Sequence, residues 1–282
     1  MLSVQNLEIR VGARVLMEDV SFRVSAGDKI GLVGRNGAGK TTLTKTLAGE
    51  TVPTNGSIDR TGEIGYLPQD PRSGDPEMLA RTRILDARGL GTISLGLSQA
   101  GIDMGSDDPK VSAKAMRTYG NLTDEFNALG GYAAEAEAAS IASNLNLPDR
   151  ILDQQLRTLS GGQRRRIELA RILFSAAETM ILDEPTNHLD ADSVVWLREF
   201  VKNYRGGCII ISHDIELVGD TVNRVFYLDA NRMVIDIYNM NWRNYQRQPL
   251  PGPERTKEEP RKALKKAEAH QHQGGNVRSQ AS

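Results

Sequence analysis

The sequence predicts an α/β fold in which helices cover a mainly parallel sheet, with an antiparallel β region at the start of the chain. Three patterns support this prediction. The first residues alternate between apolar and polar, as half-buried strands do. A short apolar strand then leads into a glycine-rich loop and a helix, over residues 29–47. From Ser160 onward, helical and strand patterns alternate, which is typical of a parallel sheet with crossover helices.

The opening strands are expected to form an antiparallel hairpin that turns near Gly12. Its apolar face carries alternating residues of both strands, namely Leu7, Ile9, Val11, Val20, Phe22 and Val24. Residues 77–147 are rich in Ala and Leu and are expected to be mostly helical. The alternating part that follows is expected to contain helices over 163–175, 193–204 and 215–221, and strands over 179–182, 208–212 and 224–228.

These patterns divide the chain into three parts. Residues 1–76 and 148–247 form the expected core, and residues 77–147 form an inserted helical subdomain that could include a short arm. The tail over 248–282 contains several prolines and few large apolar residues, so it is expected to be disordered or linker-like.

Composition narrows the functional classes. The chain of 282 residues has 35 Lys and Arg against 36 Asp and Glu, so it has almost no net field that would steer it toward nucleic acid or an anionic membrane. The only cysteine, Cys208, lies in an apolar run, which predicts a buried thiol and excludes a disulfide within one chain. No run of about 18 apolar residues and no leader pattern after Met1 occurs, so a cytoplasmic protein is expected.

The segment from Gly34 to Thr41 fits the phosphate-loop pattern G-x-x-x-x-G-K-[ST] between a predicted strand and a predicted helix. Glycines let successive backbone N–H groups point into one concavity, and the helix N-terminus adds positive potential. Lys40 is expected to reach the β and γ phosphates, and Thr41 to bind Mg²⁺. The expected phosphate site consists of Gly34, Asn36, Gly37, Ala38, Gly39, Lys40, Thr41 and Thr42.

Two carboxylates end the apolar strand at 179–182. Ligands bind at the carboxyl ends of strands in open α/β sheets, so Asp183 is placed to support Mg²⁺. Glu184 can accept a proton from, or orient, a water that attacks the γ-phosphate. The alternative is an acid pair that only caps a helix.

At this point the motifs resemble the ATP-binding cassette (ABC) ATPases. The family signature Leu-Ser-Gly-Gly-Gln stands at Leu159 to Gln163. The other family motifs follow the family order: the phosphate loop, a Q-loop ending in Gln69, the Asp183-Glu184 pair, a D-loop at Leu189-Asp190, and a switch histidine at His213. The resemblance covers residues 1 to about 245. It implies a P-loop NTPase fold of ABC type with an antiparallel β subdomain and an inserted helical subdomain, and it implies hydrolysis of ATP with Mg²⁺.

The segment from Glu184 to Asp190 is similar to the ABC-F subfamily, whose members usually carry two cassettes and act on ribosomes. The resemblance implies that Gln69 contacts Mg²⁺ and the attacking water, and that His213 contacts the γ-phosphate. It also implies that the signature contacts the nucleotide of another cassette, which makes one cassette alone incomplete. The implied signature contacts are Ser160, Gly161, Gly162 and Gln163.

Two features depart from the family pattern. Many cassettes stack an aromatic residue on adenine, but the matching position here is Val11, which predicts a weaker, aliphatic base contact. Only one phosphate loop and one signature occur, and residues 254–269 resemble the start of an ABC-F linker. We interpret the chain as one cassette, with a truncated or degenerate half as the favoured origin.

Three functions remain open. The first is an ABC-F ATPase whose helical arm meets ribosomal RNA through Lys110, Lys114 and Arg117, although these lysines and the arginine also fit a solvated helix face. The second is the ATPase subunit of a transporter, which reaches a membrane only through a partner. The third is a binding module that uses ATP as a slow switch. Failure of the chain to dimerise would favour this third reading. Hydrolysis, as the resemblance implies it, needs a second cassette, as a homodimer or a heterodimer.

Overall fold

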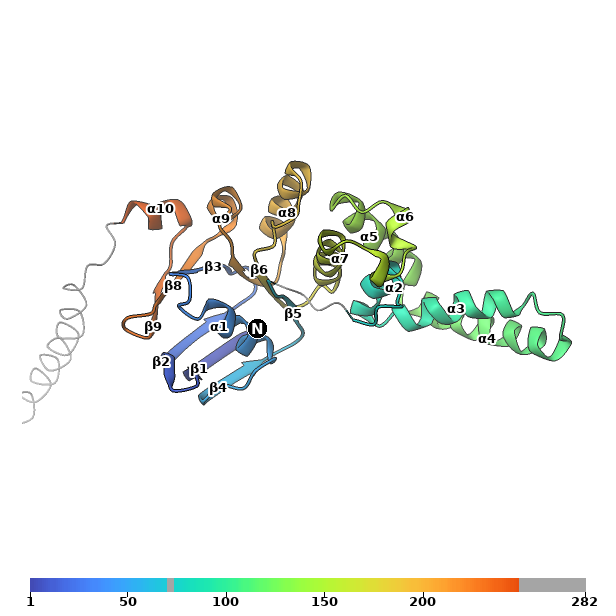
Figure 1. Ribbon diagram of the computed structural model, residues 1–282, viewed down its shortest axis with the longest axis horizontal. Coiled ribbons are helices and arrows are strands. Elements are labelled where there is room, and N and C mark those ends of the chain that lie inside the picture. The colour runs from blue at the N-terminus through green and yellow to red at the C-terminus, as the bar shows by residue number, and fades with distance from the viewer. Residues whose placement is uncertain (70–73, 249–282) are drawn as a thin grey trace, which may run out of the picture. The chain divides into compact units, whose positions relative to one another are not determined.

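The computed structural model describes residues 1–69 and 74–248, and it confirms the predicted α/β fold (Figure 1). Residues Met1–Trp242 form a first compact unit, and the described residues that follow, 243–248, belong to a second. The described strands and helices α1 to α9 lie in the first unit, whereas the last helix among the described residues, α10 (Trp242–Arg247), begins at its end. The predicted tail lies outside the described residues except for Gln248.

A three-stranded antiparallel sheet contains the predicted opening hairpin. Its central strand β1 (Leu2–Val11) pairs with β2 (Arg14–Val24) on one side and with β4 (Asn55–Arg60) on the other. The hairpin turns at Gly12, as predicted, with a positive φ of 60° that glycine adopts at no steric cost. The strand β4 was not predicted from sequence, because its residues are almost all polar and exposed and therefore show no apolar alternation.

A six-stranded sheet forms the centre of the unit, in the order β5-β6-β7-β3-β8-β9. Its first five strands are parallel, and only β9 runs antiparallel to its neighbour. Every residue of β6 and β7 is buried, as expected for central strands covered on both faces. The bounds are β3 (Lys29–Gly34), β5 (Ile64–Leu67), β6 (Thr179–Asp183), β7 (Gly207–Ile211), β8 (Arg224–Asp229) and β9 (Val234–Tyr238).

The two faces of this sheet belong to different hydrophobic clusters. Ile181 and Ile209 point toward the antiparallel sheet and α1 (Lys40–Ala48). Met180 and Ile210, the next residues on the same strands, pack on the opposite face with the helical part of the chain. The helices of that face include α7 (Gly161–Phe174), α8 (Ala191–Asn203) and α9 (Ile215–Thr221). Because successive side chains of a strand point to opposite faces, β6 and β7 contribute residues to both hydrophobic clusters.

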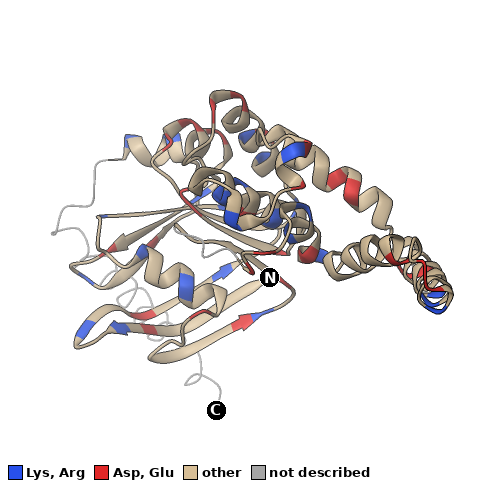
Figure 2. Cartoon of the chain, turned by 45° about the vertical axis from the view of Figure 1, so that its right-hand side comes forward, with Lys and Arg blue, Asp and Glu red and all other residues tan. Residues whose placement is uncertain are grey.

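A helical segment lies between β5 and α7. Its helices α3 (Gly91–Asp103) and α4 (Pro109–Ala128) lie side by side as a hairpin (Figure 1). The remaining elements are α2 (Ala80–Leu85), α5 (Gly131–Asn144), α6 (Asp149–Leu152) and two 3₁₀ turns at Asp86–Arg88 and Leu156–Thr158. Within the described part of the chain, no helix combines the length and the apolar character that crossing a membrane requires. Basic and acidic residues occur on both the sheets and the helices (Figure 2).

Candidate functional site

A cavity of about 540 Å³ opens at the edge of the sheet where the parallel strands end. The parallel order brings the carboxyl ends of β3, β5, β6 and β7 to this one edge, although they are far apart in the sequence. Most of the predicted site residues meet there. The lining residues are Val11, Arg14, Leu16, Asn36, Gly37, Gly39, Lys40, Thr41, Thr42, Gln69, Asp183, Glu184, Ile211 and His213.

The phosphate loop connects β3 to α1 and needs its glycines for two different reasons. A Cβ at Gly34 would lie 2.8 Å from the carbonyl oxygen of Leu228, so only glycine fits at the strand end. Gly39 has a φ of 105° and immediately precedes α1. No side chain caps the first turn of this helix and that turn contains no acidic residue, so its N–H groups and positive potential face the cavity.

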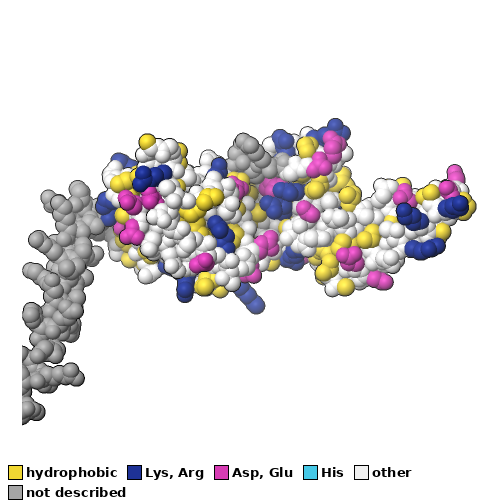
Figure 3. All heavy atoms as spheres, turned by 90° about the horizontal axis from the view of Figure 1, so that it is seen from below, with side chains coloured by type: hydrophobic (Ala, Val, Ile, Leu, Met, Phe, Trp, Pro, Cys, Tyr) yellow, Lys and Arg dark blue, Asp and Glu magenta, His cyan; other side chains and the backbone are white. Residues whose placement is uncertain are grey.

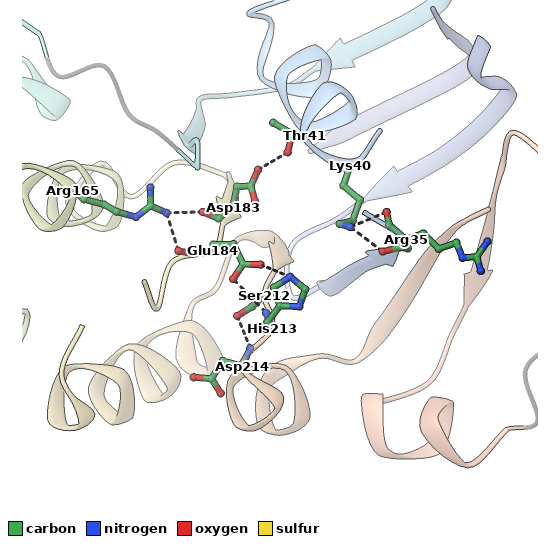
Figure 4. Close-up of polar contacts among 10 residues, drawn as sticks. Arg35, Lys40, Thr41, Arg165, Asp183, Glu184, Ser212, His213 and Asp214 are labelled. Atoms are coloured by element: carbon green, nitrogen blue, oxygen red, sulfur yellow. Dashed lines mark hydrogen bonds and ion pairs between the residues drawn. The ribbon is translucent and has the colours of Figure 1, made fainter. Parts of the chain in front are cut away.

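Lys40 lies over its own loop. Its Nζ donates to the carbonyl oxygens of Gly34, at 2.8 Å, and Arg35, at 3.2 Å (Figure 4). Burial lowers the pKa of Lys40, while the negative charges of Asp183 and Glu184 act against this shift. The ammonium group is therefore placed among acceptors that a phosphate oxygen could replace.

Thr41 and Asp183 bring two oxygen ligands together. The Thr41 hydroxyl donates to Asp183 Oδ2 at 3.1 Å, and Asp183 is only 2% exposed. Burial raises the pKa of Asp183, and the Thr41 hydrogen bond and the charges of Arg165 and Lys40 oppose this shift. A hydroxyl and one carboxylate fit Mg²⁺, which proteins commonly hold through one or two carboxylates together with substrate phosphates.

Glu184 and His213 form a second pair beside this one. The His213 ring nitrogen Nε2 lies 3.4 Å from Glu184 Oε1, and the His213 backbone N–H donates to Oε2 at 3.3 Å (Figure 4). Glu184 itself is 8% exposed and has a φ of 51°, a region that costs energy for a residue with a Cβ. Its N–H donates to the Ile211 carbonyl at 2.8 Å, which holds this turn in place. The carboxylate is thus fixed in a defined direction, whereas the His213 side chain is 81% exposed.

Arg165 is the middle residue of an arginine run, Arg164 to Arg166, in the first half of α7. In the structure it is 6% exposed and lies directly behind the site. Its guanidinium donates to the carbonyl oxygens of Asp183 and Glu184, both at 2.8 Å (Figure 4). It also donates to the carbonyl oxygens of Pro68, at 3.0 Å, and Gln69. One side chain of α7 therefore fixes the backbone of both the Q-loop and the strand end. These four partners are backbone groups, so a pattern of side chains in the sequence does not reveal them.

The signature residues lie apart from the cavity. Ser160 and Gln163 cap α7 reciprocally: Ser160 Oγ accepts from the Gln163 N–H at 3.2 Å, and Gln163 Oε1 accepts from the Ser160 N–H at 2.9 Å. Gly161 is exposed, and Gly162 lies near His188. Neither these four residues nor Gly34 and Ala38 line the cavity, and Ala38 is buried beneath the loop.

The chain is similar to two proteins of ABC-F type. It is 39% identical over 223 residues to the tylosin resistance ATP-binding protein TlrC of Streptomyces fradiae. The aligned region covers 76% of the present chain and 39% of TlrC. It is 34% identical over 224 residues to the energy-dependent translational throttle protein EttA of Haemophilus influenzae, which covers 77% of the chain and 39% of EttA. The match thus spans about two fifths of the length of either relative.

Solved structures share the fold at low sequence identity. An ATP-binding subunit of an ABC transporter matches with a TM-score of 0.63 at 20% identity, over 88% of this chain and 92% of that one. A dimeric post-hydrolysis structure of the ATP-binding cassette MJ0796 with ADP and Pi matches with a TM-score of 0.58 at 18% identity. This match covers 85% of the present chain and 98% of the MJ0796 chain. The ABC transporter family model matches residues 17–187, more than half of the chain. The chain therefore belongs to the ABC transporter family, as an ATP-binding cassette of ABC-F-like type.

Proposed function

We propose that this cassette binds Mg-ATP, closes over it with a second cassette and hydrolyses it, as part of an ABC-F protein that acts on the ribosome. One observation supports the catalytic part above all others. The Glu184–His213 pair opens into the same cavity as Lys40 and the Thr41–Asp183 pair, so groups suited to bind a triphosphate and to activate water face one space. A binding module with negligible turnover would not need this buried, fixed carboxylate.

Each residue then has a task in hydrolysis. The loop N–H groups and Lys40 hold the phosphates, with Gly37, Gly39 and Thr42 at the cavity wall. Thr41, Asp183 and Gln69 would hold Mg²⁺, which neutralises phosphate charge when bound. Glu184 orients the attacking water and accepts its proton, and His213 contacts the γ-phosphate.

The position of the signature supports a two-cassette mechanism. The four signature residues are at the start of α7, outside the cavity that holds the catalytic groups, and Ser160 and Gly161 are exposed. A second cassette could present the same helix N-terminus to the γ-phosphate held here, so that ATP joins the two domains. The MJ0796 structure, similar in fold, is a dimer bound to ADP and Pi.

The ribosomal part of the proposal rests on the relatives and on the helical segment, which we propose to be a separate subdomain over residues 77–147. EttA is named as a translational throttle and TlrC as a tylosin resistance protein. Lys110, Lys114 and Arg117 are exposed on α4, where basic groups could meet RNA phosphates. Charged and hydrophobic side chains both occur on the face of this hairpin that Figure 3 shows, so a protein contact is also compatible. A cytoplasmic location follows from this role.

The decisive experiment measures the mass of the Glu184→Gln protein by light scattering with and without Mg-ATP. Loss of the carboxylate should leave ATP bound without turnover, so the mass should double when Mg-ATP is added. The double variant Glu184→Gln, Lys40→Ala is the matched control and should remain monomeric. A Glu184→Gln protein that binds ATP yet stays monomeric would contradict self-pairing and point to a different second cassette.

Ribosome association is tested separately by cosedimentation of the Glu184→Gln protein with purified bacterial ribosomes in Mg-ATP. The triple Lys110→Ala, Lys114→Ala, Arg117→Ala variant should cosediment less and show a weaker salt dependence. The control is Lys202→Ala, because Lys202 is exposed on α8. This variant should change neither the amount of cosedimenting protein nor its salt dependence. Absence of any ATP-dependent cosedimentation would favour the transporter-subunit alternative over the ribosomal role.

A further inference from the structure

The end of the cavity away from the catalytic carboxylates contains no aromatic side chain among the described lining residues. Its wall is formed instead by Val11, Arg14 and Leu16, at the turn between β1 and β2. Leu16 marks where this wall meets the phosphate loop, because a Cβ added at Gly39 would lie 3.1 Å from Leu16 Cδ1. The hairpin end therefore continues the cavity directly from the first turn of α1.

The proposed roles of the lining residues fix the orientation of a nucleoside triphosphate in this cavity. Glu184 and His213 mark the end where the terminal phosphate reacts, and the loop and α1 hold the phosphates in the middle. The ribose and base then lie at the opposite end of the cavity, beside Val11 and Arg14.

Arg14 is well placed to meet the base. It is the first residue of β2 and lies directly across the ladder from Val11. Both side chains are exposed, Val11 by 56%. No side-chain hydrogen bond or ion pair links the Arg14 guanidinium to any other residue that the structure describes, whereas Arg10 on the partner strand is paired with Glu8. Arg14 thus contributes a cation that no neighbouring carboxylate holds in another position.

We propose that Arg14 binds the purine base of the nucleotide by stacking its guanidinium plane on the ring, with Val11 and Leu16 in apolar contact with the base. The guanidinium group is planar and more weakly hydrated than an ammonium, so it stacks on aromatic faces as a lysine cannot. Adenine and guanine both present such a face, so the class of ligand is a purine nucleoside phosphate. The proposal rests on nucleotide binding at this cavity.

The test is calorimetric titration of the full chain with Mg-ADP, which avoids turnover, and with inorganic pyrophosphate, which has no base. Arg14→Ala should weaken Mg-ADP binding roughly three- to thirty-fold, the range expected for loss of a cation–π contact, and leave pyrophosphate affinity unchanged. Arg14→Tyr should restore Mg-ADP binding, because an aromatic ring also stacks, and Arg14→Lys should restore it poorly. The matched control is Arg23→Ala, another exposed arginine of β2 that does not line the cavity.

The outcomes separate this proposal from others. Equal weakening of Mg-ADP and pyrophosphate by Arg14→Ala, with rescue by lysine, would show that Arg14 acts on the phosphates and would overturn base stacking. Unchanged Mg-ADP affinity in Arg14→Ala would also overturn it. If the unaltered chain binds pyrophosphate but not Mg-ADP, or binds neither, the nucleotide site itself is wrong, and that failure is recognisable before any variant is compared.

Discussion

Lys40 and Asp183 are partly or fully buried in the same cavity, and burial acts on their ionisation in opposite directions. It lowers the pKa of the ammonium and raises the pKa of the carboxyl group, because both charged forms lose hydration. Each group also offsets the shift of the other through its opposite charge. Each group therefore helps to keep the other charged. Replacing Lys40 removes an interaction that lowers the pKa of Asp183, and replacing Asp183 removes one that raises the pKa of Lys40.

The first prediction concerns Lys40. Lys40→Ala should reduce Mg-ATP affinity at least about a hundredfold, since it removes a charge-assisted contact to phosphate in a partly buried site. Equilibrium titration with Mg-ATP measures this loss, and Lys202→Ala, exposed and remote from the lining residues, is the control. Unchanged affinity in Lys40→Ala would remove the basis for the phosphate-loop assignment.

At the scale of residues, the sequence predicts what its linear motifs contain. The loop from Gly34 to Thr41 and the carboxylates after β6 are recognisable because their spacing along the chain is itself the requirement of the chemistry. Arg165 and Arg14 were not recognised as part of the site. Arg165 binds carbonyls up to 97 residues away, and Arg14 reaches the cavity only because β2 turns back on β1. Such proximity comes from tertiary structure alone.

At the scale of elements, α7 is tied to the site by a single buried side chain, and this gives the second prediction. Arg165→Met keeps most of the volume but removes the donors to four backbone carbonyls, so it should lower the free energy of unfolding by about 3 kcal/mol. Urea denaturation measures the change. The adjacent, exposed Arg164→Met is the control and should stay within about 0.5 kcal/mol of the unaltered chain. Equal stabilities of the two variants would show that the Arg165 network contributes nothing net.

The beginning of α7 gives the third prediction. Ser160→Ala breaks the reciprocal cap with Gln163 and should cost about 1 kcal/mol of stability, because one N–H of the first turn loses its acceptor. Thermal or urea unfolding measures this loss of stability. The control is Ser143→Ala, which replaces an exposed serine that does not cap the start of α5. If the cap were unimportant, both serine variants would unfold alike.

The elements differ in how well the sequence predicts them. The predicted helices and strands after residue 160 lie within two residues of α7, β6, α8, β7, α9 and β8, because each has a distinct apolar period. β4, β5 and β9 were not predicted. β4 lacks an apolar face, and β5 has only four residues and pairs with β6. β9 has five residues, none of them fully buried.

At the scale of the whole unit, the sheet divides the core, and Cys208 lies at its centre. The thiol belongs to β7, between β6 and β3, and is fully buried on the face that packs with the helices. Burial raises its pKa to about 12, so the reactive thiolate is suppressed in the folded state as well as shielded. The final prediction is that an aromatic disulfide reagent at pH 8 modifies Cys208 only after the unit opens, at a rate equal to the opening equilibrium constant multiplied by the labelling rate of the exposed thiol.

Ligand binding in the cavity should therefore change the labelling rate of Cys208. A ligand that binds only the folded unit lowers the open population by 1 + [L]/Kd, so Mg-ADP at about a hundred times its Kd should slow labelling about a hundredfold. Lys40→Ala should abolish this protection without changing the labelling rate measured in denaturant, which separates loss of binding from loss of folding. Labelling of Cys208 that is fast and insensitive to Mg-ADP would mean that the sheet opens locally around β7, and that the nucleotide cavity and the helical face of the core do not unfold as one cooperative unit.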